Sequence, residues 1–175
     1  LAEDLLAPAG APRLWFYPGS SIGNFPPDAA RGFLARIARA CGALLIGVDL
    51  VKDKAVLDAA YDDALGVTAA FNLNVLNHVN RLLPADFDVA DWRHVAFFDP
   101  VASRIEMHLE ARRDVAVQLA GQARRFTTGE RIHTEDSWKW TPAGFAALLE
   151  EAGLPKQRRW LDTEGGFALF LAEPA

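Results

Sequence analysis

Two adjacent serines near the start of the chain stand in a pattern that can support nucleophilic catalysis. The segment GSSIG, residues 19–23, matches G-x-S-x-G with Ser21 at its centre. In α/β-hydrolases this pattern places a nucleophilic serine on a sharp turn between a strand and a helix. Taken alone, it predicts a serine hydrolase. Against that interpretation, residues 24–28 (NFPPD) displace the helix that should follow at once, and no histidine is clearly placed after a strand near the C-terminus.

Other side chains with chemical potential favour structural roles. The four histidines are His78, His94, His108 and His133. No two of them have the spacing of a zinc-binding helix or finger, and no cysteine is near them, so we expect no metal site. Asp62 and Asp63 are neighbours, and adjacent side chains diverge on a helix, which favours capping or surface roles over acid–base catalysis. Cys41 falls on the apolar side of an expected helix and predicts a buried thiol.

The composition is that of a chain able to bury a core. Its 175 residues are 51% hydrophobic, which suits one domain or one domain with an insertion. A formal net charge of −5 argues against a nucleic-acid partner, because such proteins normally carry a basic face. No apolar run approaches the roughly 18 residues of a membrane span. We therefore expect a soluble, cytoplasmic monomer that binds neither nucleic acid nor membrane.

The elements on either side of the serine segment are predicted to form an α/β unit. Four bulky residues, LWFY at Leu14–Tyr17, predict a buried strand that stops at the loop. Residues 28–41 have helical apolar spacing, and residues 43–50 (ALLIGVDL) form the continuous apolar run of an interior parallel strand. Together they predict one right-handed crossover unit. The junction between such a strand and its loop is where ligands bind in open α/β sheets.

From residue 67 the pattern changes to that of an α+β module. Residues 52–66 and 67–83 predict two helices. The second helix carries an apolar stripe that we expect to face the core: Val67, Phe71, Val75, Val79 and Leu82. Strands are expected at 92–99, 104–113, 114–120 and within 124–140, where residues 127–130 form a turn.

The end of the chain returns to the α/β pattern. Residues 141–153 predict a helix with Thr141 as its N-cap and Pro142 at its first position, and residues 156–173 predict a hairpin. We therefore divide the chain into a sheet region at 1–66, an inserted module at 67–140, and a closing helix and hairpin at 141–175.

Several of these segments resemble one enzyme family. The histidine-specific methyltransferases of ergothioneine biosynthesis contain segments similar, in the same order, to FYPGSSIGNF, LLIGVDLVKD, AAYDDALGVTAAFNLNVLNHVNR, SRIEMHL and IHTEDSWKWTPAGF. The resemblance covers residues 14–171. It implies an α/β, class I (Rossmann-like) methyltransferase fold with an inserted substrate-binding module. It also implies S-adenosylmethionine as cofactor and L-histidine as substrate, whose α-amino nitrogen is methylated three times to give hercynine.

One part of the family pattern is missing from these residues. The glycine-rich cofactor loop of the family is not found here, and the chain opens with Leu1 rather than Met. The resemblance therefore implies the C-terminal portion of such an enzyme. Gly19 and Ser20, in the loop after the first expected strand, are the candidate cofactor contacts within it.

The resemblance assigns substrate contacts residue by residue. It implies that Asn24 and Tyr61 hold the carboxylate of histidine, and that Met107 lines the substrate pocket. It implies that Glu135 and Ser137 contact the imidazole. Residues two apart on a strand point the same way, so both side chains can reach one ring. No catalytic residue is assigned.

Other interpretations of these residues stay open. Asn24 also suits a turn, Tyr61 a half-buried aromatic, and Met107 an ordinary core position. The chain as a whole also suits a non-catalytic amino-acid-binding domain of the same fold. A third alternative is a methyltransferase of this family that acts on another amino acid.

Overall fold

The computed structural model describes residues 13–40 and 42–175, so the expectations for Cys41 and for the opening segment lie outside the described residues. The chain divides into two compact units. The first unit comprises Leu1–Lys52 and Ser137–Ala175, and the second comprises Asp53–Asp136. The expected α/β character is confirmed, and each unit contains its own sheet and helices.

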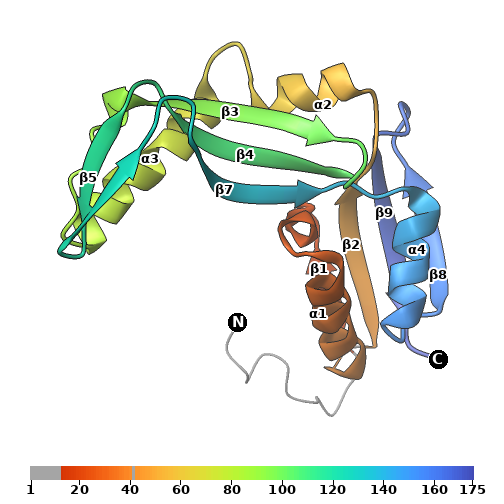
Figure 1. Ribbon diagram of the computed structural model, residues 1–175. Coiled ribbons are helices and arrows are strands. Elements are labelled where there is room, and N and C mark those ends of the chain that lie inside the picture. The colour runs from red at the N-terminus through yellow and green to blue at the C-terminus, as the bar shows by residue number, and fades with distance from the viewer. Residues whose placement is uncertain (1–12, 41) are drawn as a thin grey trace. The chain divides into compact units, whose positions relative to one another are not determined.

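In the described residues, the first unit is a four-stranded sheet with two α-helices and a short 3-10 helix at Ser21–Asn24. Its elements are β1 (Leu14–Tyr17), α1 (Pro27–Ala40), β2 (Ala43–Asp49), α4 (Pro142–Glu151), β8 (Lys156–Leu161) and β9 (Phe167–Glu173). The strand order is β1-β2-β9-β8, with β1 parallel to β2 and β9 antiparallel to both of its neighbours. The predicted strand–helix–strand unit and the terminal hairpin are therefore both present, joined in one sheet (Figure 1).

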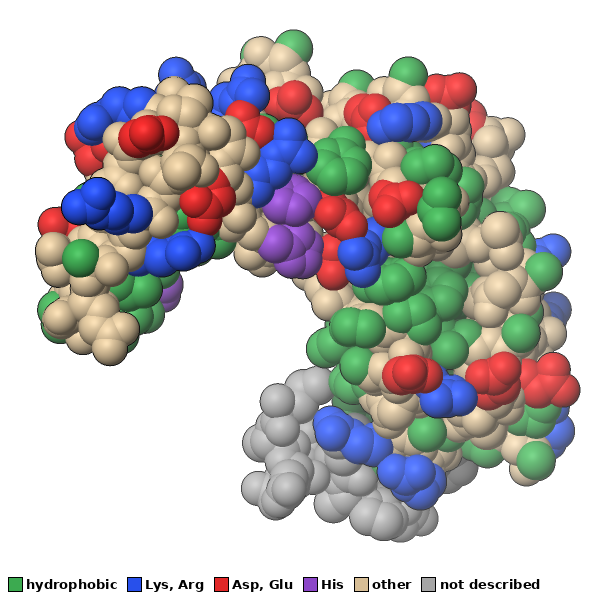
Figure 2. Space-filling model, viewed as in Figure 1, with side chains coloured by type: hydrophobic (Ala, Val, Ile, Leu, Met, Phe, Trp, Pro, Cys, Tyr) green, Lys and Arg blue, Asp and Glu red, His purple; other side chains and the backbone are tan. Residues whose placement is uncertain are grey.

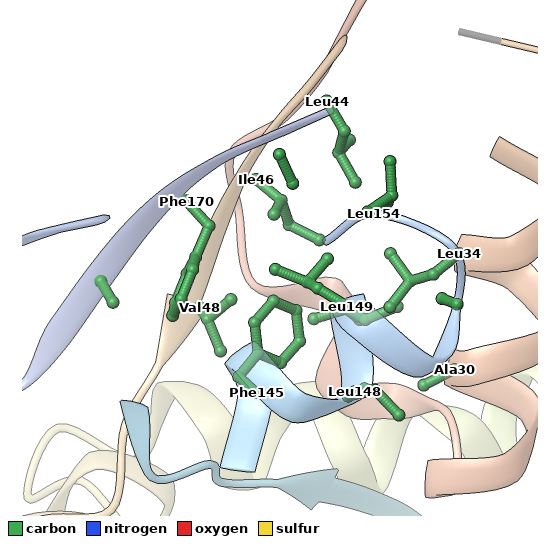
Figure 3. Packing of buried hydrophobic residues seen from close by; sticks show 14 of the residues in the cluster. Ala30, Leu34, Leu44, Ile46, Val48, Phe145, Leu148, Leu149, Leu154 and Phe170 are labelled. Carbon is green, nitrogen blue, oxygen red and sulfur yellow. The ribbon is translucent and has the colours of Figure 1, made fainter. Parts of the chain in front are cut away.

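Both helices of the first unit pack on the same face of its sheet. Leu34 of α1 and Phe145 of α4 lie in one fully buried cluster with Ile46, Val48 and Phe170 from the strands (Figure 3). The start of α4 is fixed as its sequence predicts, because the Thr141 side chain accepts a hydrogen bond from the Gly144 N–H and Pro142 begins the helix. This core holds the carboxyl ends of β1 and β2 in place.

The strand β1 shows two different faces. Trp15 and Tyr17 pack against the buried cluster, whereas Leu14 and Phe16 are 60% and 64% exposed. Side chains alternate across a strand, so Leu14 and Phe16 lie on the sheet face opposite to the two helices. The strand was expected to be buried; among the described residues, only one of its faces is covered.

The second unit combines a three-stranded sheet, a hairpin, two α-helices and a short 3-10 helix at Val89–Asp91. Its elements are α2 (Lys54–Tyr61), α3 (Val67–Leu82), β3 (Trp92–Asp99), β4 (Arg104–Ala111), β5 (Val115–Leu119), β6 (Gln122–Phe126) and β7 (Arg131–Trp138), the last two residues of β7 belonging to the first unit. The sheet order is β3-β4-β7, and β5 pairs with β6 alone. Among the described residues, no helix is both long and apolar enough to cross a membrane.

The unit boundaries differ from those read from the sequence, which were at residues 66 and 140. The helix α2 packs on β3 and β4 and so belongs to the second unit. At the other boundary, Trp140 pairs with Leu50 in an isolated bridge, and its carbonyl accepts from the Val51 N–H at 3.0 Å. Backbone pairing therefore ties residues 137–140 to the first unit.

Only part of the predicted apolar stripe of α3 packs in the core, where Val79 contacts the buried cluster that contains Leu76. Val67, Phe71 and Leu82 are 66%, 65% and 65% exposed, whereas Leu76 and Asn72 are buried. The helix carries apolar residues on two sides, so periodicity alone does not choose between them. The choice is made by polar contacts: the Asn72 amide reaches His94 Nδ1 at 2.9 Å and the His108 carbonyl at 3.1 Å.

Candidate functional site

The loop that follows β1 is fixed against the end of β2. Ser20 has the left-handed φ of 57°, and its Oγ accepts a hydrogen bond from the Asp49 N–H at 2.7 Å. Gly47 is required below the loop, because a Cβ there would lie 2.1 Å from the Pro18 carbonyl oxygen. At Gly19 a Cβ would meet no atom within 4 Å, so the loop presents open space at this position.

The same loop brings the segments of two predicted substrate residues together. A Cβ on Gly23 would lie 2.8 Å from the Trp138 carbonyl oxygen and 3.5 Å from Ser137 Oγ. The loop backbone therefore packs directly on residues 137–138, and Asn24 is the next residue of the loop. Within the first unit, Asn24 and Ser137 thus belong to two segments in contact.

Ser137 is part of a buried polar network that includes an ion pair. Lys139 is 3% exposed, and its Nζ donates to Ser137 Oγ at 3.0 Å and pairs with Asp49 Oδ2 at 2.8 Å. Lys52 Nζ pairs with Asp49 Oδ1 at 2.6 Å. Burial alone would raise the pKa of Asp49, but the hydrogen bonds from Lys139 and Lys52 outweigh it and hold that pKa below its usual value.

Sequence reasoning missed Asp49 and Lys139. The available signal was modest: an Asp that ends an otherwise apolar strand, and a Lys between two tryptophans where a strand gives way to a helix. A buried lysine normally has a charged partner, since an isolated ammonium is costly to desolvate. Its burial is visible only once the fold is known.

Tyr61 and Met107 meet in the second unit. Met107 is 4% exposed in a cluster with Leu57, Phe98 and Ile105, and Tyr61 packs against that cluster. The Tyr61 carbonyl also lies 2.8 Å from His94 Nε2. Because the Asn72 amide donates to His94 Nδ1, the tautomer with its proton on Nε2 satisfies both contacts. The end of α2 is thereby fixed to the sheet through the His94 ring.

Glu135 lies on the strand next to Met107. The preceding residue, Thr134, donates its hydroxyl to the Met107 carbonyl at 3.0 Å. Burial raises the pKa of the Glu135 carboxyl above its ordinary value. A partly desolvated carboxylate of this kind is a strong acceptor for an N–H group.

A group of imidazole and charged side chains covers the sheet of the second unit. The ring of His108 stacks on Phe97, and its centroid lies 5.1 Å from that of His133. Figure 2 shows histidine side chains next to acidic and basic ones on this face of the protein. His133 Nε2 also reaches Asp136 Oδ1 at 2.9 Å, although the two residues are three apart on β7.

The described residues support neither a metal site nor a hydrolase with Ser21 as its nucleophile. Among the described residues, no group of three or more His, Cys, Asp or Glu side chains is arranged to hold a metal ion. The hydroxyl of Ser21 donates to Tyr17 Oη at 2.9 Å rather than to an imidazole, and all four histidines belong to the second unit. In this loop the residue with a left-handed backbone conformation is Ser20, and not Ser21, the nucleophile that the G-x-S-x-G pattern suggests.

The second unit contains a cavity of about 710 Å³. Its lining is mainly apolar and includes Leu76, Val79, Phe87 and Phe126, and none of the five predicted substrate contacts is among its described lining residues. The lining also includes Arg124 and Arg131, which pair with Glu130 and Glu110. The predicted contacts instead divide between the units, with Asn24 and Ser137 in the first and Tyr61, Met107 and Glu135 in the second.

Comparison with known proteins gives a consistent result. Residues 2–174 match the sequence model of a family described as histidine-specific methyltransferase, SAM-dependent. The histidine N-alpha-methyltransferase of Mycobacterium tuberculosis is 46% identical over 170 residues, which is 94% of this chain and 53% of that protein. Ergothioneine biosynthesis protein 1 of Neurospora crassa is 33% identical over 148 residues, 81% of this chain and 16% of that protein. The chain therefore spans about half, or less, of the relatives it matches.

Solved structures are similar at a lower level. A S-adenosylmethionine-dependent methyltransferase from Clostridium acetobutylicum shares 8% identity with this chain, and its TM-score is 0.48. The alignment covers 98% of this chain and 63% of that one. A similarity of this size adds nothing to the comparison of sequences.

Proposed function

We propose a function from one premise: this chain belongs to the family of histidine-specific, S-adenosylmethionine-dependent methyltransferases. The proposal is that the protein containing it methylates the α-amino nitrogen of L-histidine, in three steps, to give Nα,Nα,Nα-trimethylhistidine in ergothioneine biosynthesis. The observation that carries it is the 46% identity to a histidine N-alpha-methyltransferase over 94% of this chain. The parallel β1–β2 pair with α1 as its crossover supports a class I fold.

Residues at the carboxyl ends of β1 and β2 fit a cofactor contact. The cofactor, when bound, supplies a methyl group already activated by its sulfonium. Gly19 leaves open space beside the loop, and the Asp49 N–H fixes the orientation of the Ser20 hydroxyl. In open α/β sheets this edge is where ligands bind. We propose that Gly19 and Ser20 contact the cofactor there.

The substrate contacts then have separate tasks. Asn24 and Tyr61 donate to the carboxylate of histidine, and the buried Met107 gives the pocket its shape. Glu135 accepts from an imidazole N–H, a charge-assisted contact worth about 1.5–3 kcal/mol. Ser137 contacts the same ring. Holding the neutral amine in line with the methyl group can lower the activation barrier by up to about 7–11 kcal/mol in ideal cases.

The proposal is tested with the protein extended to its full upstream reading frame. The protein is incubated with S-adenosylmethionine and a panel of amino acids, and the products are analysed by mass spectrometry. We expect mass gains of one, two and three methyl groups on histidine. Methylation of another amino acid alone would place the error in the imidazole contacts. No methylation at all would favour a non-catalytic binding domain.

A further inference from the structure

We propose that α3 and the cavity beside it form one docking surface, and that its occupant is an amphipathic helix from the part of the same polypeptide outside these 175 residues. All residues of this surface belong to the second unit. None of the five predicted substrate contacts belongs to α3 or to the described lining of the cavity. The surface is therefore independent of the proposed methylation of histidine.

An unbroken row of apolar side chains runs along α3 at intervals of four residues. Its members are Val67, Phe71, Val75, Val79 and Leu83, the residue that caps the helix. Phe71 is 65% exposed, and Leu83 is 47% exposed. Residues four apart are neighbours on a helix surface, so these five side chains form one ridge, the α3 ridge. Single exposed apolar residues are ordinary, but a continuous row of them marks a binding surface.

The α3 ridge runs into the cavity of the second unit. Val75, Val79 and Leu83 line this cavity of about 710 Å³, together with Leu119 of β5 and Phe126 of β6. The helix α3 thus forms one wall of the cavity, and the hairpin of β5 and β6 forms another (Figure 1). The exposed half of the ridge and the cavity are therefore one continuous apolar surface.

The spacing of the α3 ridge indicates what kind of segment covers it. A ridge of residues four apart packs into the groove between ridges of a second helix, in the commonest class of helix–helix contact in globular proteins. An amphipathic helix presents such grooves on its apolar side, and its larger apolar side chains can enter the cavity. A helix is therefore the occupant that fits both parts of the surface.

The charges beside this surface favour an acidic occupant. The helix α3 contains no Asp or Glu, and the charged residues in the described lining of the cavity are Arg124 and Arg131. They pair with Glu130 and Glu110, but Glu110 also pairs with Arg93, so these five side chains carry a net positive charge. A helix with Asp or Glu beside its apolar residues complements this charge.

The comparison of lengths indicates where the occupant comes from. The alignment with the Mycobacterium tuberculosis protein covers 94% of this chain but only 53% of that protein. About half of such a polypeptide is thus available to cover surfaces that these residues leave exposed. A segment of the same polypeptide has a high effective concentration, which favours it over a second molecule.

The first test is photochemical cross-linking in the full-length protein. Phe71→p-benzoyl-L-phenylalanine keeps an aromatic ring in the α3 ridge and forms a covalent bond to its neighbour on illumination. The protein is an equal mixture of unlabelled and isotope-labelled molecules, and mass spectrometry identifies the joined peptides. We expect cross-links within one molecule to a segment outside these 175 residues that carries Asp or Glu beside apolar residues.

Three results of this experiment would contradict the proposal. Cross-links between labelled and unlabelled molecules would show that a second copy occupies the α3 ridge. Cross-links confined to these 175 residues would show that the chain covers the ridge itself. A cross-linked segment with basic rather than acidic flanking residues would contradict the charge complementarity.

Leu82 provides a matched control on the same helix. It is 65% exposed, as Phe71 is, but it lies outside the α3 ridge and outside the described lining of the cavity. Full-length Phe71→Cys and Leu82→Cys variants are treated with a thiol reagent, and peptide mapping resolves the labelled position from Cys41. We expect labelling at position 71 to be on the order of a hundredfold slower than at position 82. Equal rates would show that nothing covers the ridge.

A further measurement needs no substitution, because a change at Phe71 can weaken the packing it probes. Hydroxyl-radical footprinting of the wild-type full-length protein should oxidise Phe71 on the order of tenfold more slowly in the native than in the urea-unfolded state. Leu82 should differ by less than about threefold between the two states. Equal protection of both residues, or of neither, would overturn the proposal. These measurements report packing, so a failure to methylate histidine would contradict the proposed function alone.

Discussion

The two units of this chain are both built on apolar clusters, but they differ in how their polar side chains are used. In the first, the helices α1 and α4 share one apolar cluster, and the main buried charges gather at the end of β2. In the second, polar side chains tie the helices to the sheet. Asn72 of α3, for example, donates to His94 Nδ1 on β3 at 2.9 Å and to the His108 carbonyl on β4 at 3.1 Å. Apolar clusters therefore stabilise both units, and in the second unit hydrogen bonds also orient a helix on the sheet.

The largest effect is expected in the apolar core of the first unit. Phe145 is fully buried between Trp140 and Phe170. Phe145→Ala should lower the free energy of unfolding by about 3–5 kcal/mol, because it leaves a cavity. Urea denaturation of the protein measures the change. A loss below about 1 kcal/mol would show that this cluster is not tightly packed.

On α3, a pair of leucines tests which side faces the core. Leu76 is 3% exposed and Leu82 is 65% exposed. Leu76→Ala should cost about 2–5 kcal/mol, whereas Leu82→Ala should change the free energy of unfolding by less than about 0.5 kcal/mol. A larger loss for Leu82→Ala than for Leu76→Ala would show that the side of α3 carrying Leu82 faces the core.

The polar attachment of α3 should be weaker than its apolar contacts. Asn72→Ala leaves His94 Nδ1 and the His108 carbonyl without their amide donor. We expect a loss of about 1–3 kcal/mol, the cost of unsatisfied buried polar groups. Asn74→Ala on the exposed side of the same helix is the control. Equal, small losses for both variants would count against a role for Asn72 in orienting the helix.

The smallest effect concerns pH. Burial lowers the pKa of His108, and the nearby His133 and Arg131 lower it further against the opposing charges of Glu106 and Asp136. The unfolded chain, with a pKa near 6.5, then binds the proton more readily than the folded protein. Stability contributed by neutral His108 is present above about pH 6.5 and is lost as the pH falls through the folded pKa.

Urea denaturation between pH 8 and 5 measures this dependence. His108→Phe keeps a ring to stack on Phe97. This change should remove the part of the fall in the free energy of unfolding below about pH 6.5 that comes from protonation of His108. His78→Phe, an exposed change on α3, serves as the comparison. An unchanged decline in the His108 variant would contradict the assignment.

The elements of the first unit were largely predictable, because β2 is continuously apolar and α4 has clear capping residues. The orientation of α3 was not predictable, because Asn72 is buried through hydrogen bonds to residues 22 and 36 positions away. The residues of the candidate site also differ in how they could be found. Asn24, Tyr61, Met107, Glu135 and Ser137 came from similarity of sequence. Lys139 and Asp49 emerged only from burial and distance, which no local pattern records.

The central claim is that Glu135 recognises the imidazole of the substrate, and kinetics of the full-length enzyme test it directly. Glu135→Ala should raise the KM for histidine by on the order of tenfold or more and leave the KM for S-adenosylmethionine within about twofold. Asp136→Ala, the acidic neighbour on β7 that contacts His133, should leave the KM for histidine nearly unchanged. A Glu135 variant with equal rises in both KM values, or with no rise for histidine, would contradict the account.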